Sequence, residues 1–344
     1  MKRVFIHGIG AVSPAGWDVS SLSQTLDCGA PVATAPLERP GWKRPLAARR
    51  VPQPMPKLAF LAHARLRRTS PMSLYAAAAA MEALEGSGYI RSAGHRLGII
   101  FCVTAGCVQY TRRFYDEAWR NPAIASPVLF PETVFNAPSS HLAALLESSC
   151  VNYTLVGDPG TFLQGLALAA GWLLDGRVDS CLVAGAEEID WLTADAHRRF
   201  SRGVVCGEGA GAVYLSCQSP ADNLGTELIA ITGPRLYLNG MSRVQAIREM
   251  RAELPSAGAE ALLCDSLAGW PARDRAEMEA WSDWDGARLS PRRVLGEGLM
   301  AAGAWQCVAA LDRLREGRHS TALVSMTGSH QQAIGACFSR GTNG

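Results

Sequence analysis

The residues best placed to do chemistry lie where an apolar strand runs into an apolar helix, in the stretch TLVGDPGTF (154–162). A side chain at the start of a buried helix faces the positive end of the helix dipole, which favours a nucleophilic anion there. This chain has Asp158 and Pro159 at that point, and proline offers neither a nucleophile nor an N–H. We interpret Asp158 as the N-cap of the helix and Pro159 as its first residue, since an aspartyl nucleophile would still need a base.

Two further candidate positions lie later in the chain. Ser266 follows a short apolar run, and Glu297 precedes a helix rich in small residues. An enzyme such as a hydrolase or an acyltransferase that uses Asp158, Ser266 or Glu297 is therefore one interpretation. In such an enzyme, a carboxylate at position 297 would repel the negative charge that develops on the oxygen of the attacked carbonyl group. The simpler interpretation of Glu297 is an acid at a helix start or a partner of Arg292 or Arg293.

The histidines and cysteines show no pattern typical of metal binding or acid–base catalysis. His141 and His197 have no motif partners, and His330 is interpreted as a satisfied or exposed surface residue. The ten cysteines are scattered through apolar runs, without the spacing of a zinc site or a disulfide framework. Cys150, the cysteine nearest to Pro159, precedes the strand. We interpret the cysteines as reduced core thiols and expect no metal.

One glycine motif bears on cofactor binding. Gly8 and Gly10 follow an apolar strand, as in a dinucleotide-binding turn, but Ser13 stands where the third glycine should be. In the stretch GEGAGAVYL (207–215) the strand comes after the glycines instead of before them. Its small residues favour the close passage of two backbones. We therefore expect no nucleotide cofactor.

Composition narrows the class of protein. The chain has 344 residues, of which 48% are hydrophobic and 19% charged, as is typical of a compact α/β protein with a large interior. A net charge of +2 argues against wholesale nucleic-acid binding. No apolar run is long enough to span a bilayer, and residues 1–16 lack a signal-peptide pattern. We expect a cytoplasmic protein.

The candidate residues are positioned by elements that occur twice in the same order. Each half alternates strands with helices and closes with a helix followed by two apolar strands, which predicts a duplicated α/β fold. We place the halves at residues 1–220 and 221–344 of one compact unit; one large Rossmann-like sheet is the alternative. The expected strands include Leu97–Val103, Tyr153–Val156, Cys181–Val183, Gly211–Cys217, Leu228–Thr232, Ala261–Cys264, Ala322–Met326 and Ile334–Phe338.

Several motifs resemble β-ketoacyl-carrier-protein synthases of the elongating, fatty-acid and type II polyketide kind. The most specific are GRVDSCLVAGAEE (176–188) and GEGAGAVYL (207–215). The stretches VFIHGIGAVSPAG (4–16), RRTSPMSLYAAAAAMEAL (67–84) and SPVLFPETVFNAPSSHLAALL (126–146) are similar to the family in the same order. The resemblance covers nearly the whole chain. It implies a thiolase-like α/β fold, with duplicated βαβαβαββ halves in a layered αβαβα arrangement.

The same resemblance implies that the catalytic groups of the family are missing. Its nucleophilic cysteine, two histidines and lysine fall on Pro159, Ser266 (Asp265 if the alignment slips), Glu297 and Arg292, respectively. Its closing glycine-rich phenylalanine loop is replaced by TGSHQQ (327–332). The resemblance therefore implies that this chain performs neither condensation nor decarboxylation of a malonyl extender.

What remains resembles a chain-length factor, a non-catalytic subunit that pairs with an active ketosynthase in type II polyketide or aryl polyene systems. The resemblance implies a heterodimer with that ketosynthase and an acyl carrier protein as a further partner. An enzyme with recruited residues and a solitary module that binds acyl carrier protein are the alternatives.

The resemblance also implies two segments that contact the partner. In the family, the strand before the nucleophile pairs across the dimer axis, and the helix that begins here near Gly106 reaches the acyl tunnel. The strand residues are Asn152, Tyr153, Thr154, Leu155 and Val156, and the helix residues are Val108, Tyr110, Thr111, Phe114 and Tyr115. Ordinary core packing is the alternative role for the helix.

The stretch 39–68 is basic, rich in proline and free of acids. Because carrier proteins are usually acidic, this stretch is expected either to steer one electrostatically or to form a solvated connection. Its cations are Arg39, Lys43, Arg44, Arg49, Arg50, Lys57, Arg65, Arg67 and Arg68.

Overall fold

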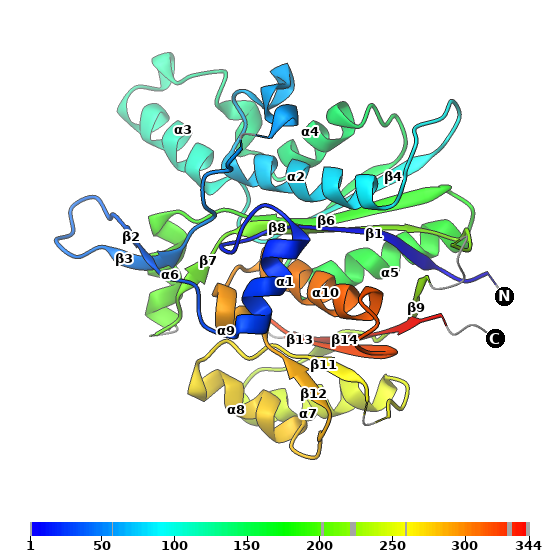
Figure 1. Cartoon of the computed structure of the whole chain (residues 1–344). Coiled ribbons are helices and arrows are strands. Elements are labelled where there is room, and N and C mark those ends of the chain that lie inside the picture. The colour runs from blue at the N-terminus through cyan, green and yellow to red at the C-terminus, as the bar shows by residue number, and fades with distance from the viewer. Residues whose placement is uncertain are drawn as a thin grey trace.

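The computed structural model describes residues 2–56, 58–200, 203–220, 225–258, 260–328 and 332–341. Figure 1 shows two sheets, each covered by helices on its outer face, with more helices between them. This arrangement is the expected thiolase-like αβαβα layering, which is confirmed. No helix of the described residues combines the length and the apolar character needed to cross a membrane.

The first half of the chain forms the upper sheet in Figure 1. Its strands lie in the order β5-β4-β6-β8-β1, with β4, β5 and β6 parallel and β8 antiparallel to both of its neighbours. Every residue of β4, β6 and β8 is buried, as expected where both faces of a sheet are covered. The bounds are β1 Phe5–Val12, β4 Leu97–Val103, β5 Asn152–Val156, β6 Ser180–Glu187 and β8 Gly209–Ser216.

The second half repeats this topology. Its strands lie in the order β12-β11-β13-β14-β9, so that both sheets read 3-2-4-5-1 when strands are numbered within each half. The predicted duplication is confirmed, and a short pairing of β1 with β9 joins the two sheets. The boundary expected at residue 220 adjoins residues 221–224, which lie outside the described residues. The bounds are β9 Thr226–Ile231, β11 Leu262–Cys264, β12 Ala287–Leu289, β13 Thr321–Thr327 and β14 Gln332–Arg340.

The helices form the other three layers. α2 (Pro71–Gly86) packs on the outer face of the first sheet, and α7 (Gly240–Glu253) with α8 (Pro271–Ala280) covers the outer side of the second (Figure 1). α5 (Thr161–Leu174) and α10 (Met300–Arg315) lie between the sheets. All residues of α10 except Asp312 and Arg315 are buried, which fits a helix enclosed by two sheets.

Small residues let the middle helices approach the sheets. A Cβ added to Gly211 of β8 would lie 2.8 Å from the Cβ of Ala304 in α10, and one added to Gly209 would clash with the carbonyl of Val12. The glycines of GEGAGAVYL therefore serve close packing, as the sequence predicted.

The shorter elements depart from expectation in the basic stretch. Residues 39–68 contain β3 and two short 3-10 helices, so this stretch is not a simple solvated connection. The strands β2 (Ala35–Leu37), β3 (Leu46–Arg49) and β7 (Cys206–Gly207) form a small separate sheet. The remaining elements are α1 Val19–Cys28, η1 Ala59–Ala62, η2 Ala64–Leu66, α3 Val108–Arg120, η3 Pro122–Ile124, η4 Phe130–Thr133, α4 Ala137–Leu145, α6 Trp191–Phe200, β10 Arg235–Leu236 and α9 Pro291–Leu295.

Candidate functional site

The candidate positions converge in the interior, between the ends of the central strands and the starts of the two middle helices. Pro159 lies between β5 and α5, Ser266 follows β11, and Glu297 precedes α10. A Cβ on Gly303 of α10 would clash with the carbonyl oxygen of Pro159. The turn before α5 therefore rests directly on the second middle helix.

The carboxylate of Asp158 accepts a hydrogen bond from the backbone N–H that follows Pro159. Its Oδ1 accepts a hydrogen bond of 3.0 Å from the N–H of Gly160 and another from the side-chain amide of Gln332. The helix begins at Thr161, two residues later than the sequence predicted, because the preceding residues form a tighter turn in which Thr161 N–H bonds Asp158 C=O. Asp158 still caps this turn, and no N–H exists at Pro159 to bind an oxyanion.

Ser266 is engaged on both sides of its hydroxyl. Its Oγ donates to the carbonyl of Ser325 (2.9 Å) and accepts from the N–H of Thr327 (2.9 Å). The amide of Gln306 approaches the same oxygen at 3.4 Å. Because the hydroxyl proton is held by a carbonyl oxygen instead of a base, this geometry suits a structural bridge better than a nucleophile.

Asp265 is also tied into the structure. Its Oδ1 accepts from the hydroxyl of Ser290 (2.7 Å) and from the N–H of Leu267 (3.2 Å). Burial, reinforced by the charge of Glu277, raises the pKa of Asp265 to about 7. The carboxyl group therefore caps the loop after β11.

Glu297 is a buried member of an ion-pair cluster. Its Oε2 lies 3.1 Å from Nη1 of Arg273 and 3.7 Å from Nη1 of Arg292, while Oε1 accepts from the N–H of Leu299 (3.1 Å). Burial raises the pKa of Glu297, but the charges of Arg292 and Arg273 outweigh it and hold the value at about 2. The expected partner Arg292 is present, and Arg273, which the sequence did not indicate, lies closer.

Thr327 joins these groups to the outer helices. Its carbonyl accepts from Arg292 (3.0 Å) and Arg273 (3.2 Å), and its hydroxyl accepts from Arg243 of α7 (2.9 Å) and donates to Glu277 of α8 (3.3 Å). Sequence reasoning missed Arg243 and Arg273, which belong to no motif of the family. Their side chains meet only because α7 and α8 both cover the same end of β13.

The other expected residues contribute less. Cys150 lies before β5, at the end of the strand opposite Pro159, so it does not replace the missing thiol. His330 lies outside the described residues, as do its two neighbours in the TGSHQQ stretch, residues 329 and 331. His141 is buried and pairs with Glu132 at 2.7 Å, a partner that the sequence did not suggest.

The strand expected at the partner interface is the free edge of the first sheet. β5 pairs with β4 on one side and ends the strand order. Tyr153 and Val156 are each 54% exposed. A sheet edge with apolar side chains and free backbone groups is a template for another chain.

The expected tunnel helix lies at the margin of the core. None of the thirteen residues of α3 is buried, although the partly buried Tyr110 packs against the core of the first half. Phe114 packs against Phe130 of η4, with ring centroids 5.5 Å apart, and the exposed Tyr115 stacks on Trp119. An amphipathic helix with uncovered aromatic side chains is typical of an interaction surface.

The basic stretch divides into two groups. Arg39 pairs with Asp195 at 2.7 Å, Arg49 donates to the carbonyl of Val32, and Arg50 pairs with Glu208. These arginines hold the local structure and do not form a continuous free surface. Lys57 lies outside the described residues. Arg50 is exposed although it pairs with Glu208, and the other exposed cations are Lys43, Arg44, Arg65, Arg67 and Arg68.

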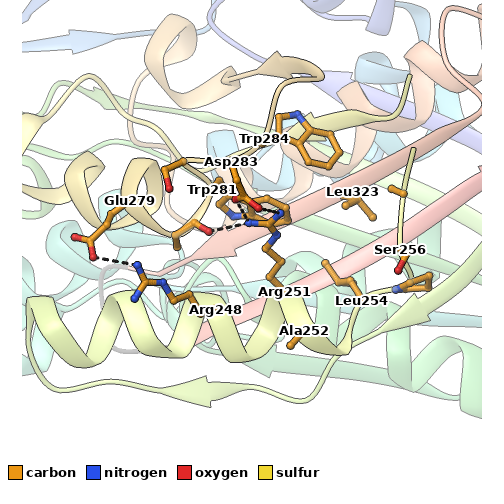
Figure 2. A pocket seen from close by; sticks show the side chains of 14 residues that line it. Arg248, Arg251, Ala252, Leu254, Ser256, Glu279, Trp281, Asp283, Trp284 and Leu323 are labelled. Carbon is orange, nitrogen blue, oxygen red and sulfur yellow. Dashed lines mark hydrogen bonds and ion pairs between the residues drawn. The ribbon is translucent and has the colours of Figure 1, made fainter. Parts of the chain in front are cut away.

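A hollow of about 580 Å³ lies apart from this site, at the ends of α7 and α8. Figure 2 shows that its charged side chains pair with one another: Arg248 with Glu279 (3.2 Å) and Arg251 with Asp283 (2.5 Å). The guanidinium of Arg251 also lies over the ring of Trp281. These mutual contacts leave the hollow without a charged group directed at a ligand.

Comparison with known proteins agrees with this geometry. Residues 1–221 match the family described as β-ketoacyl synthase, N-terminal domain. No curated protein matches the chain.

Several solved structures share the fold over almost the whole chain. The ishigamide ketosynthase/chain length factor is similar with a TM-score of 0.82, at 20% identity over 98% of this chain and 99% of that one. A type II polyketide synthase acyl-carrier protein in complex with its ketosynthase gives 0.81, at 18% identity over 98% and 99%. A ketosynthase in complex with its chain length factor from Xenorhabdus doucetiae gives 0.78, at 14% identity over 98% of both chains.

Proposed function

The chain belongs to the β-ketoacyl synthase family, and we propose that it is a non-catalytic subunit that pairs with an active β-ketoacyl-carrier-protein synthase and helps to set acyl chain length. The observation that carries this proposal is the turn at Asp158 and Pro159. It lacks a thiol, it lacks an N–H at Pro159, and the carboxylate of Asp158 occupies the next donor. A condensing enzyme needs a nucleophile and an oxyanion hole at this point.

The residues at the histidine positions support the same proposal. Ser266 is held between a carbonyl and an amide, and Glu297 is a buried anion between two arginines. Neither group donates a hydrogen bond to a thioester or to a malonyl carboxylate. These contacts therefore favour a structural role for the residues at the positions where an active ketosynthase has its catalytic histidines.

The exposed surface of the first half favours a protein partner. β5 offers a free sheet edge, and α3 with η4 offers uncovered aromatic side chains. Large, apolar contacts are typical of obligate interfaces. Among similar structures, the ketosynthase from Xenorhabdus doucetiae is in complex with a chain length factor, so we propose an equivalent heterodimer here.

An acyl carrier protein is the second proposed partner. One similar structure holds a carrier protein in complex with its ketosynthase. In this chain the exposed cations Arg65, Arg67 and Arg68 precede α2, and acidic carrier proteins are attracted by such a group. We propose that the carrier protein delivers the chain to the active partner while this subunit contributes charge near the docking path.

Pairing is tested by co-expression with the ketosynthase encoded as its partner, followed by size-exclusion chromatography with light scattering. We expect a heterodimer with wild-type protein and its loss with Val156→Asp, because a carboxylate would be buried against the partner. Leu238→Asp is the matched control, since Leu238 is an exposed apolar residue far from β5 in the sequence and in the second half. A wild-type chain that stays monomeric beside the ketosynthase contradicts the proposal.

The alternatives predict different behaviour. A hydrolase or acyltransferase would be active alone and would lose activity with Asp158→Asn, Ser266→Ala or Glu297→Gln. A solitary binding module would retain acyl-carrier-protein affinity without a ketosynthase. The free edge of β5 favours the heterodimer over both.

A further inference from the structure

The segment 126–136, between α3 and α4, has its polar and apolar side chains in inverted places. Val128, Phe130, Val134 and Phe135 are between 42% and 54% exposed, whereas Glu132 is only 7% exposed. Carboxylates are almost never buried unless they are paired, and exposed apolar clusters mark interaction surfaces. The segment therefore buries the carboxylate of Glu132 together with Leu129, while four of its apolar side chains stay exposed.

The buried carboxylate has one partner. Oε1 of Glu132 lies 2.7 Å from Nε2 of His141 in α4, which is also buried. The other polar atoms, Oε2 of Glu132 and Nδ1 of His141, have no hydrogen-bond partner among the described residues. Leaving buried polar groups unpaired is unfavourable, and two apolar side chains in these places would avoid that cost. The pair therefore contributes little to stability, but its hydrogen bond fixes the position of Glu132 relative to His141.

The short helix η4, which carries Glu132, packs against both α3 and α4. The contact between Glu132 and His141 therefore joins η4 to α4 where η4 also meets α3. Burial raises the pKa of Tyr110 in α3, and the charge of Glu132 raises it further.

The segment meets α3 at two further points. Phe130 packs against Phe114, with ring centroids 5.5 Å apart. Phe135 lies against Gly106, where an added Cβ would be 2.9 Å from its ring. The position of Phe130 against α3 therefore depends on the contacts that hold the segment, among them the one between Glu132 and His141.

We infer that Glu132 and His141 are positioning residues that hold Phe130 against Phe114 and so determine where the acyl tunnel of the assembled pair ends. The inference rests on the proposed function and deepens it, because it assigns product length to a buried hydrogen-bonded pair as well as to the aromatic side chains. Neither residue needs to touch the acyl chain. Without the pair, the segment keeps the buried Leu129 and its contacts with α3 but loses its polar link to α4, and Phe130 shifts away from Phe114.

The test uses the complex of this chain with its ketosynthase and compares product lengths. Glu132→Ala and His141→Ala should each shift products to greater length by at least one extension step, and the double variant should shift them no further than either single change. Glu132→Gln keeps a hydrogen-bond acceptor for His141 and should keep wild-type length. Glu279→Gln, which breaks an exposed ion pair with Arg248, is the matched control.

Product length separates positioning from a merely structural role. A structural role lowers the yield of complex or its melting temperature but leaves the length of the remaining product unchanged, and that result overturns the inference. If an alanine variant does not fold, Glu132→Asp is the deciding variant, because it keeps a buried carboxylate but shortens the side chain by one methylene. Longer products from Glu132→Asp support the positioning role of Glu132, and unchanged products contradict it. A wild-type chain that does not pair contradicts the proposed function instead.

Discussion

At the scale of single residues, the groups that the family resemblance matches to a condensing enzyme's reactive side chains bond to their neighbours. Asp158 caps the turn before α5, Ser266 bridges β11 to β13, and Glu297 neutralises Arg273. Each is buried, so each needs partners to offset the loss of water. These contacts support the proposal that the place of the family's reaction centre is part of the packed interior here.

The first prediction concerns restoring the nucleophile. Pro159→Cys should not create decarboxylating or condensing activity, because Ser266 and Glu297 still replace both histidines. General acid–base and oxyanion contributions are worth about 10²–10⁴-fold each, so slow self-acylation is the most we expect. The measurement is carbon dioxide release from malonyl-carrier protein by the variant without its partner. Turnover like that of an ordinary ketosynthase contradicts the non-catalytic assignment.

The second prediction concerns the buried ion pair. Glu297→Gln keeps the shape of the side chain but leaves Arg273 and Arg292 without their anion. Breaking a buried pair typically costs about 3–5 kcal/mol, and we expect a loss of that size in the free energy of unfolding at pH 7, measured by denaturant titration. Glu147→Gln, which breaks an exposed pair with Arg91, should have little effect. A loss no larger than that of the control contradicts the prediction.

The same pair gives a pH dependence with a definite sign. The pKa of Glu297 is lowered from 4.5 to about 2: burial raises it, but Arg292 and Arg273 outweigh burial. A lowered acid pKa contributes stability above the unfolded value, and that contribution is lost as the pH falls through the folded value. The stability difference between wild type and Glu297→Gln should therefore shrink between pH 4.5 and pH 2. A constant difference across this range argues against ionised Glu297.

At the scale of elements, α3 and β5 are the parts of the first half that remain unfinished in a single chain. α3 leaves Tyr115 and Trp119 exposed, and among the described residues β5 has one strand neighbour. For β5 this follows from the topology, since it is the last strand of the order. An element that is incomplete alone becomes complete in an assembly.

The third prediction concerns the tunnel helix. Phe114→Ala should lengthen the products of the assembled pair, because it removes the ring that packs against Phe130. Tyr115→Ala should do less, since Tyr115 is directed to solvent and stacks on Trp119. The measurement is mass spectrometry of products from pairs of equal stability. Equal lengths from wild type and Phe114→Ala count against α3 as the gate.

At the scale of the whole molecule, the two halves have the same strand order but different surfaces. The first half carries the free strand edge and the exposed basic group before α2, whereas the second half has its charged side chains paired across α7 and α8 (Figure 2). Interaction with other proteins is therefore expected mainly through the first half.

The fourth prediction concerns carrier-protein binding by that basic group. Reversing Arg65, Arg67 and Arg68 to glutamate should weaken binding of acyl carrier protein to the complex at least tenfold at low salt, and the difference should diminish at high salt. Arg275→Glu, an exposed change on α8, is the control. Affinity by calorimetry that is the same at low salt removes the steering proposal. Arg49 and Arg50 are unsuitable targets because both are engaged internally.

Much of the fold was predictable because strands and helices follow local patterns. The continuous apolar runs of β4, β6 and β13 predicted buried strands. Ser70 caps α2 and Pro71 is its first residue, a start that local residue types are sufficient to encode. The order of these elements predicted the duplication. The small sheet of β2, β3 and β7 was not predicted, because its short strands gain stability only from distant partners.

In the candidate site, too, some features follow from the sequence and others only from the tertiary structure. The sequence by itself determined that position 159 has neither a thiol nor an N–H, since it is a proline, and the family resemblance matched Glu297 to a histidine. Only the tertiary structure decided what these residues do instead. Arg273 approaches Glu297, and His141 approaches Glu132, because helices and loops that are separate in sequence pack at the same strand ends. Such pairings depend on distances through space, which no local pattern of residue types encodes.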